Sequence, residues 1–107
     1  MNKLTITCRE FRLLQRNTLR GFAEIRIAEL RLNIDGIAIH EKNGKQWAQL
    51  PARPQLRDGE LVRGDDGKLQ YMPLMSFETR AVSDAFSAAV IAAVRELAPH
   101  AFEEVRA

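Results

Sequence analysis

The sequence predicts an α+β fold: an antiparallel sheet of about five strands in a meander, with one long C-terminal helix packed on one face. Runs of alternating apolar and polar residues follow one another through residues 4–50, and this alternation is typical of half-buried strands. Short polar turns separate the runs, which favours antiparallel neighbours. One long segment, residues 76–97, combines a helical repeat with the absence of Gly and Pro. A lone helix must bury its apolar stripe against another layer, so we expect it to lie on the sheet.

The first three strands are predicted at residues 4–14, 21–30 and 30–41. In the first, the alternation changes phase near Arg9–Glu10, which indicates a bulge or an end to pairing. In the third, it changes phase at Asp35–Gly36, and a Gly inside a strand pattern favours a bulge. The apolar positions expected in the second strand and after the phase change of the third are Ala23, Ile25, Ile27, Ile37 and Ile39.

The chain after residue 41 continues with a turn, a strand and a long polar stretch. Lys42-Asn43-Gly44 predicts a tight hairpin, because Asn-Gly supplies the positive φ angles it needs, and a strand follows at residues 45–51. Residues 51–68 are rich in Gly, Pro and Asp, which indicates a surface loop, with or without a small hairpin that turns at Asp66-Gly67. Residues 69–74 read as a short edge strand.

The predicted helix spans residues 76–97, with Ser76 as its N-cap, Glu78 in its first turn and Pro99 just beyond its end. Residues 99–107 form a tail, and nothing divides the chain, so we expect one domain over residues 1–107. The apolar residues that recur at three- and four-residue steps are Val82, Ala85, Phe86, Ala89, Val90, Ala93 and Leu97.

The distribution of charge and the number of cysteines indicate which partners and which cellular compartment to expect. The net charge is +2, but residues 1–31 hold seven basic and three acidic residues (7 − 3 = +4), and the remainder holds nine basic and eleven acidic (9 − 11 = −2). This asymmetry is compatible with an anionic partner. A single cysteine, Cys8, favours a reducing compartment. With no apolar leader and no run of about 20 apolar residues, we expect a soluble cytoplasmic protein without membrane contact.

The residues that could support catalysis or metal binding are few and scattered. Cys8, His40 and His100 lack the short spacings of metal sites, so no metal or other cofactor is expected. Cys8 is interpreted as a small buried hydrophobe rather than a nucleophile activated by His40. Asp65-Asp66-Gly67 lacks the alternating oxygen ligands of a calcium loop and is interpreted as a turn. We therefore expect no enzyme.

Two basic groups remain as candidates for nucleic-acid binding. Arg80 at the helix start could hold a phosphate together with the helix N–H groups, near the basic residues Arg53, Arg57 and Arg63 of the polar stretch. The second group lies on strands, where pairing with Glu10, Glu24 and Glu29 is the alternative to nucleic-acid contact; it consists of Arg9, Arg12, Arg16, Arg20, Arg26 and Arg31. The open sheet face is expected to carry Phe22 and Trp47, which favours a homodimer interface there.

Residues 5–97 resemble the SpoVG family of small bacterial regulators, named for a stage V sporulation protein. The resemblance rests on the order of short motifs: GFAEIRI, then LRLNIDGIAIHEKNGKQWAQLPAR, then Asp58-Gly59-Glu60, Met72-Pro73-Leu74 and Thr79-Arg80. It implies a homodimer that binds DNA, and also RNA, and modulates transcription without catalysis. Arg53 and Arg80 match basic positions of that family, and residues 61–68 read as an insertion.

Two functions are therefore weighed. The first is a homodimeric nucleic-acid-binding regulator in which Arg80 and the loop arginines contact phosphates. The alternative is a protein–protein interaction module on the same fold, which would dock a partner through Trp47, Phe22 and the acidic pair Asp65-Asp66. The two differ in salt dependence, because phosphate contacts weaken as salt rises and apolar contacts do not.

Overall fold

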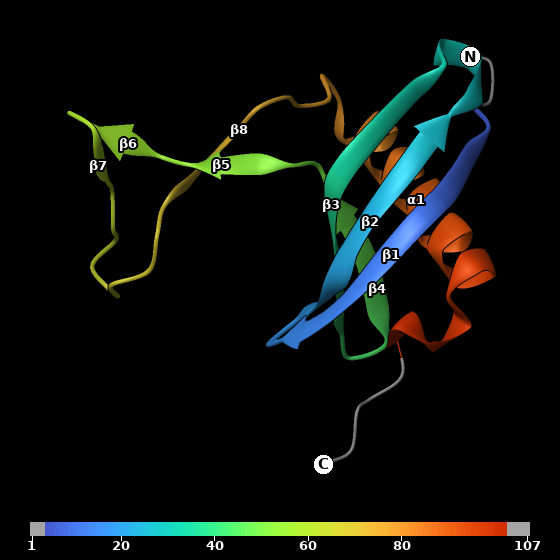
Figure 1. The fold of residues 1–107 in the computed structure, drawn as a ribbon, viewed down its shortest axis with the longest axis horizontal. Coiled ribbons are helices and arrows are strands. Elements are labelled where there is room, and N and C mark those ends of the chain that lie inside the picture. Colours follow the sequence, from blue (N-terminus) through green and yellow to red (C-terminus); the bar gives the residue numbers. More distant parts are fainter. Residues whose placement is uncertain (1–3, 103–107) are drawn as a thin grey trace.

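The computed structural model describes residues 4–102 (Figure 1). Lys3 of the basic N-terminal third and residues 103–107 of the predicted tail lie outside this range. The elements are, in chain order, β1 (Ile6–Arg16), β2 (Leu19–Ile27), η1 (Ala28–Leu30), β3 (Leu32–Lys42), β4 (Lys45–Gln49), β5 (Ala52–Pro54), β6 (Leu56–Arg57), β7 (Glu60–Leu61), β8 (Tyr71–Pro73), α1 (Arg80–Leu97) and η2 (Pro99–Phe102).

The predicted fold class is confirmed. Four antiparallel strands form a meander in the order β1-β2-β3-β4, and α1 packs on one face of this sheet (Figure 1). The fifth strand, expected at residues 69–74, does not join the sheet. Part of it forms β8, which pairs with β5 in a separate two-stranded sheet. β5 follows β4 in the chain but lies outside the four-stranded sheet, so its partner β8 lies outside it as well.

Both predicted bulges are present, one in β1 and one in β3. Between the pairs Cys8–Ile25 and Glu10–Glu24, β1 has one residue more than β2. Between the pairs Ile25–Ile34 and Ala23–Ile37, β3 has one residue more than β2, and Gly36 there adopts a φ of 77°. A one-residue insertion reverses which side chains face the helix. The bulges therefore keep apolar residues on the helix side both before and after the phase change, Cys8 and Phe11 in β1 and Ile34 and Ile37 in β3.

The core lies between the sheet and α1, and the expected strand residues are in it. Ala23, Ile25, Ile27, Ile37 and Ile39 are all buried. Each fully buried isoleucine contributes about 2 kcal/mol through its loss of contact with water. The helix meets them with Phe86, Val90, Ile91, Ala93 and Val94.

Two details of the predicted helix are wrong. It begins at Arg80 rather than near Ser76, because the extended Thr79 is the N-cap and its hydroxyl accepts from the Val82 N–H at 3.3 Å. Its buried face is also rotated. Leu97, expected in the core, is 50% exposed, because the chain turns into η2 and Ala98 and Ala101 cover the core there instead. Ala85 is also exposed. No helix within residues 4–102 is long and apolar enough to cross a membrane.

The stretch predicted as a surface loop is instead part of a protruding ribbon, here called the arm and defined as residues 52–73. In the arm, β5 pairs with β8 and β6 pairs with β7 through the turn at Asp58-Gly59. A second turn contains Asp66-Gly67, as the alternative reading of the sequence expected, and an isolated bridge joins Arg63 to Leu69 across it. The arm projects away from the sheet and α1, which together form the body of the molecule (Figure 1).

Candidate functional site

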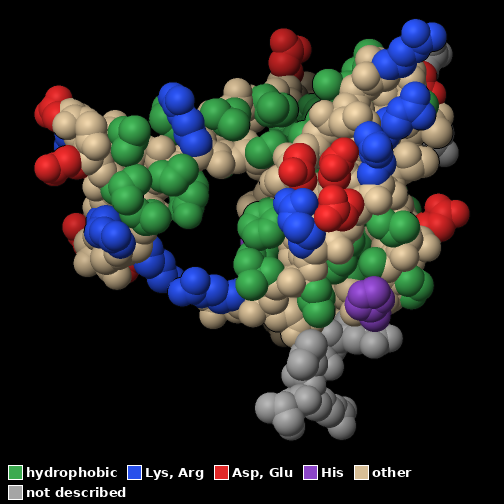
Figure 2. Space-filling view, viewed as in Figure 1, with side chains coloured by type: hydrophobic (Ala, Val, Ile, Leu, Met, Phe, Trp, Pro, Cys, Tyr) green, Lys and Arg blue, Asp and Glu red, His purple; other side chains and the backbone are tan. Residues whose placement is uncertain are grey.

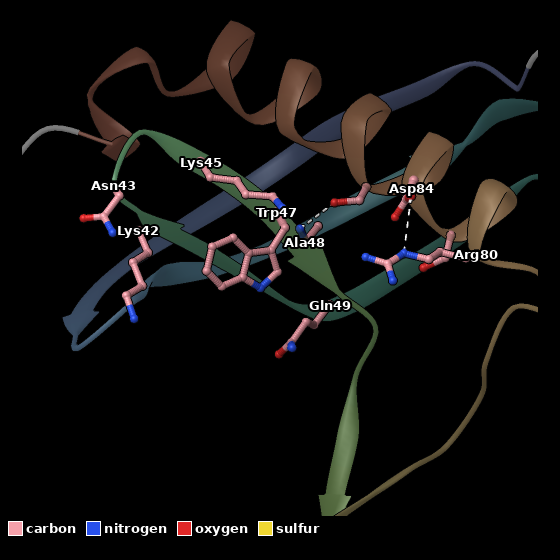
Figure 3. Close-up of a pocket in the computed structure, with 10 residues that line it drawn as sticks. Lys42, Asn43, Lys45, Trp47, Ala48, Gln49, Arg80 and Asp84 are labelled. Atoms are coloured by element: carbon pink, nitrogen blue, oxygen red, sulfur yellow. Dashed lines mark hydrogen bonds and ion pairs between the residues drawn. The ribbon is translucent and has the colours of Figure 1, made fainter.

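A groove of about 710 Å³ runs between the outer edge of β4 and the first half of α1 (Figure 3). We call it the β4–α1 groove. Three cations line it, Lys42, Lys45 and Arg80, against one acid, Asp84, so its lining carries 3 − 1 = +2. Trp47 is the aromatic residue among them. The other lining residues are Asn43, Ala48, Gln49, Ser83 and Ser87.

The floor of the groove is fixed by contacts between α1 and the edge strand. In an antiparallel pair, every second residue of an edge strand directs its N–H and C=O groups away from the partner strand. Ala48, opposite Ile39 of β3, is such a residue of β4. The Ser87 hydroxyl accepts the outward N–H of Ala48 at 2.8 Å. Further along, the Arg95 guanidinium donates to the side-chain oxygen of Gln46. The helix is thus held along the β4 edge at two places, which sets the width of the groove.

Trp47 is held in place by its cross-strand neighbour. Its ring stacks on His40, with centroids 5.3 Å apart and planes 7° apart. His40 is itself bracketed, because Nδ1 lies 3.0 Å from the Thr18 hydroxyl and Nε2 lies 3.1 Å from the Gln49 side-chain oxygen. Partial burial lowers the pKa of His40 below its ordinary 6.5, and the hydrogen bond to Gln49 opposes that shift. The indole therefore forms a rigid, half-buried wall of the groove.

Arg80 stands at the opposite end of the groove from Lys42, in the first turn of α1 (Figure 3). Its side chain is 90% exposed, and an ion pair from its Nε to Asp84 Oδ2 spans 3.8 Å. Exposed i,i+4 pairs contribute only about 0.3–0.5 kcal/mol, so the guanidinium stays available to a ligand. The first turn of the helix carries no acid, and a cation there opposes the helix dipole. A bound anion would relieve that opposition.

The strand arginines do not extend the groove. On the open face of the sheet, Arg9 lies 3.5 Å from Glu24, and Arg12 lies 3.9 Å from Glu10 and 3.1 Å from Asp35. Acidic and basic side chains gather together over this face in Figure 2. The alternative considered from the sequence, pairing with neighbouring carboxylates, therefore holds for these two arginines.

Glu29, one of the carboxylates considered as partners for the strand arginines, binds Thr5 instead. Its two carboxylate oxygens accept from the Thr5 hydroxyl and backbone N–H, each at 2.7 Å. These hydrogen bonds lower the pKa of Glu29.

The three loop arginines lie on the arm and do not line the groove. Arg53 sits in β5 opposite Met72, Arg57 sits opposite Glu60, and Arg63 donates to the Gly67 carbonyl at 3.0 Å. Sequence reasoning missed Lys42 and Lys45, which flank the Asn43-Gly44 turn and pair with each other across it. The signal was present in the hairpin, because a two-residue turn always brings its two flanking residues together.

Phe22 and Trp47, expected on the open sheet face, are both half-buried there. Phe22 pairs with Arg12 on β1 and with Ala38 on β3, and Ala38 pairs in turn with Gln49 on β4. Gln49 is two residues from Trp47, so both point to the same face of the sheet. The two aromatic side chains thus share a face, with Ala38 and His40 on the strand between them.

The other reactive side chains do not assemble. Cys8 packs against the core on the helix side of the sheet, and His40 lies on the opposite side, so they form no nucleophile–base pair. Burial raises the pKa of the Cys8 thiol, which favours its protonated form. Within residues 4–102, no three His, Cys, Asp or Glu side chains are grouped so that they could hold a metal ion.

The arrangement therefore places three cations beside an aromatic wall, in a groove open to solvent. Comparisons of this chain with protein-family models, with curated proteins and with solved structures give no match.

Proposed function

We propose that this protein is a non-enzymatic, cytoplasmic nucleic-acid-binding regulator that acts as a homodimer and binds its ligand in the β4–α1 groove. The observation that carries the proposal is the combination of Lys42, Lys45 and Arg80 around Trp47 in one groove. Proteins that bind single strands combine a cationic channel for the backbone with aromatic rings on which bases stack. The motif order that resembles the SpoVG family supports the same assignment independently.

The composition of the groove favours single-stranded over duplex ligands. An indole gains stacking energy only from an unpaired base, and such a contact contributes about 1–3 kcal/mol. The three cations would neutralise up to three phosphates. Counterion release from single strands then gives a slope of about −2 for the logarithm of affinity against the logarithm of salt concentration.

Trp47 is the only tryptophan in the chain, so its fluorescence reports directly on the groove. Titration with single-stranded DNA and RNA oligonucleotides at low salt should quench it, and fluorescence anisotropy of labelled oligonucleotides should give the same affinity. Arg80→Ala and Lys45→Ala should each weaken binding and make the salt slope shallower. Arg26→Ala, at an exposed arginine outside the groove, is the matched control and should leave both unchanged.

The proposal fails if no oligonucleotide binds at concentrations up to about 100 µM, the weak end of non-specific binding. It also fails if Arg80→Ala and Arg26→Ala behave alike, because the groove would then have no special part in binding. Equal affinity for duplex and single strand with unchanged Trp47 fluorescence would exclude the stacking role.

The second candidate function is a protein-interaction module, and the arm favours it. The arm contains four basic and four acidic residues, so its net charge is 4 − 4 = 0 and it does not attract a polyanion. A protein partner captured on immobilised protein and retained at high salt, without oligonucleotide binding, would support this function. Loss of that partner on deletion of residues 61–68 would place the contact on the arm.

A further inference from the structure

The arm is built as a ribbon that has no layer beneath it. Its backbone is closed by hydrogen bonds from Gln55 N to Gln70 O at 2.7 Å, from Val62 N to Gln55 O at 3.0 Å and from Gln70 N to Val62 O at 2.9 Å. The radius of gyration is 15.0 Å, whereas a compact chain of this length has about 13 Å. Two-stranded ribbons are marginally stable in water without a surface to pack on. The arm therefore needs a packing partner.

The arm and the segment that follows it expose a concentration of apolar side chains. Of the twelve large apolar residues that are exposed within the described chain, six fall between residues 56 and 75. Leu56 and Leu61 face each other across the β6–β7 pair at the outer end, with exposures of 60% and 50%. Figure 2 shows an opening between the arm and the body, with apolar side chains of the arm on one side of it and apolar side chains of the body on the other. Exposed apolar side chains in this concentration mark an interaction site.

The same chain also carries a receptor for such a surface. A cleft of about 580 Å³ lies at the root of the arm, between the end of β4, β8 and the start of α1. Its apolar lining includes Leu50, Tyr71, Met75, Phe77 and Phe86. Phe77 and Phe86 contact each other with ring centroids 5.0 Å apart, which makes the helix side of the cleft firm.

We propose that two copies of this chain exchange arms, so that Leu56 and Leu61 at the tip of one arm pack into the root cleft of the other copy. This inference rests on the homodimer of the proposed function and deepens it by assigning its interface to the arm, in place of the open sheet face with Phe22 and Trp47. Two arms laid antiparallel about a twofold axis bring each tip to the other root whatever their length, because the arms are identical. Both contacts then form together, as a twofold interface requires.

Charge and stability both favour a second copy over another occupant. The arm has balanced charges, so neither a polyanion nor a strongly acidic peptide is attracted to it. The apolar side chains of the arm are exposed in every folded copy of the chain, so the partner that covers them has to be present at all times. A second copy meets that condition, whereas an occasional partner would leave the apolar tip in water between encounters.

The oligomeric state of the full chain tests the proposal by sedimentation velocity. At roughly 100 µM, the wild-type chain should be a dimer, and Leu56→Asp with Leu61→Asp should raise the dissociation constant by roughly a hundredfold. Leu30→Asp is the matched control, because Leu30 is 61% exposed and lies outside the arm. It should remain dimeric. Unchanged circular dichroism at low protein concentration shows that the arm variants still fold.

Cross-linking locates the contact. With Cys8→Ser as background, protein carrying Leu61→Cys is mixed with protein carrying Met75→Cys and oxidised. A covalent heterodimer is expected, because tip and root of different copies meet. Each protein carries a single cysteine, either at the arm tip or beside the root cleft, so a disulfide between them has to join two copies.

The outcomes separate this inference from nucleic-acid binding. A wild-type monomer, a dimer that survives Leu56→Asp with Leu61→Asp, equal loss of the dimer in Leu30→Asp, or absence of the tip-to-root heterodimer would each overturn arm exchange. Loss of Trp47 quenching by oligonucleotide with an intact dimer would overturn only the nucleic-acid assignment. An arm variant that is monomeric and whose Trp47 fluorescence is still quenched by oligonucleotide supports both arm exchange and nucleic-acid binding, because all residues of the β4–α1 groove come from one copy.

Discussion

The body and the arm of this molecule are held together in different ways. In the body, Ile25, Ile37 and Ile39 lose all contact with water between the sheet and α1. In the arm, no residue from 52 to 73 is buried, and its short strands are joined mainly by backbone hydrogen bonds. The difference shows that one chain can combine a region that is stable by its own packing with one whose stability depends on what lies against it.

Removal of core volume should separate the two regions most clearly. Ile25→Ala leaves a cavity where the side chain is fully buried, and we expect it to cost about 4 kcal/mol of unfolding free energy. Leu56→Ala removes a side chain that is 60% exposed and should cost less than about 0.5 kcal/mol at protein concentrations that favour the monomer. Urea unfolding of both variants is the measurement. Equal losses would mean that the arm shares the stability of the core.

Glycine substitution tests whether strain passes from one region to the other. A Cβ at Gly21 would lie 2.3 Å from the Arg12 carbonyl oxygen and 2.6 Å from the Phe11 ring, so Gly21→Ala should force β1 away at a cost of about 3 kcal/mol. At Gly59, φ is 81° and a Cβ would meet no atom within 4 Å. Gly59→Ala should therefore strain only the arm turn, by about 1 kcal/mol.

Hydrogen exchange measures both glycine variants residue by residue. Gly21→Ala should speed exchange throughout β1 and β2, whereas Gly59→Ala should speed it only in the arm, where protection is already low. Faster exchange of β2 amides in the Gly59→Ala protein would contradict the independence of the two regions.

The junction between arm and body depends on one helix cap. Thr79→Ala removes the acceptor of the Val82 N–H and should destabilise the protein by about 1 kcal/mol. Thr79→Ser keeps the hydroxyl and should recover most of that loss. Thermal unfolding of the two variants side by side is sufficient. If the serine variant were as unstable as the alanine variant, the cap would have no role and the methyl group of Thr79 would have to carry the effect.

The alternation of the strands allowed much of the body to be predicted, because each buried isoleucine of β2 and β3 sits at a position that the period of two singles out. The helix face was predicted less well. Residues 82–97 are apolar in more than one helical register, and Ile91 and Val94 could replace Leu97 and Ala85 without changing the pattern. Only the position of the sheet decides which register is buried.

The arm and the groove were beyond sequence patterns for different reasons. β6 and β7 have two residues each, which is too short for any periodicity to be detected. The groove brings Lys42 and Lys45 close to Arg80, which is more than 30 residues further along the chain. That proximity arises from the packing of α1 along β4.

The smallest expected effect concerns pH. Since the pKa of His40 is lowered by burial, the unfolded chain takes up a proton first as the pH falls below about 6.5. The free energy of unfolding should therefore decline slightly from there down to the pKa of the folded state. His40→Gln should make the free energy of unfolding less dependent on pH in this range, because the substituted side chain does not titrate. Urea midpoints at several pH values provide the measurement, and an unaltered slope in the variant would assign the dependence to another group.

The contact between Ser87 and β4 has a consequence for the protein at high concentration. Outer strands offer unpaired N–H groups to any strand that approaches, and fibrils grow by such templating. Here the hydroxyl of Ser87 occupies the outward N–H of Ala48 at 2.8 Å, near the middle of β4. A foreign strand would have to lift the helix before it could add to the sheet. The contacts of Ser87 and Arg95 with β4 thus make this edge a poor template for another strand.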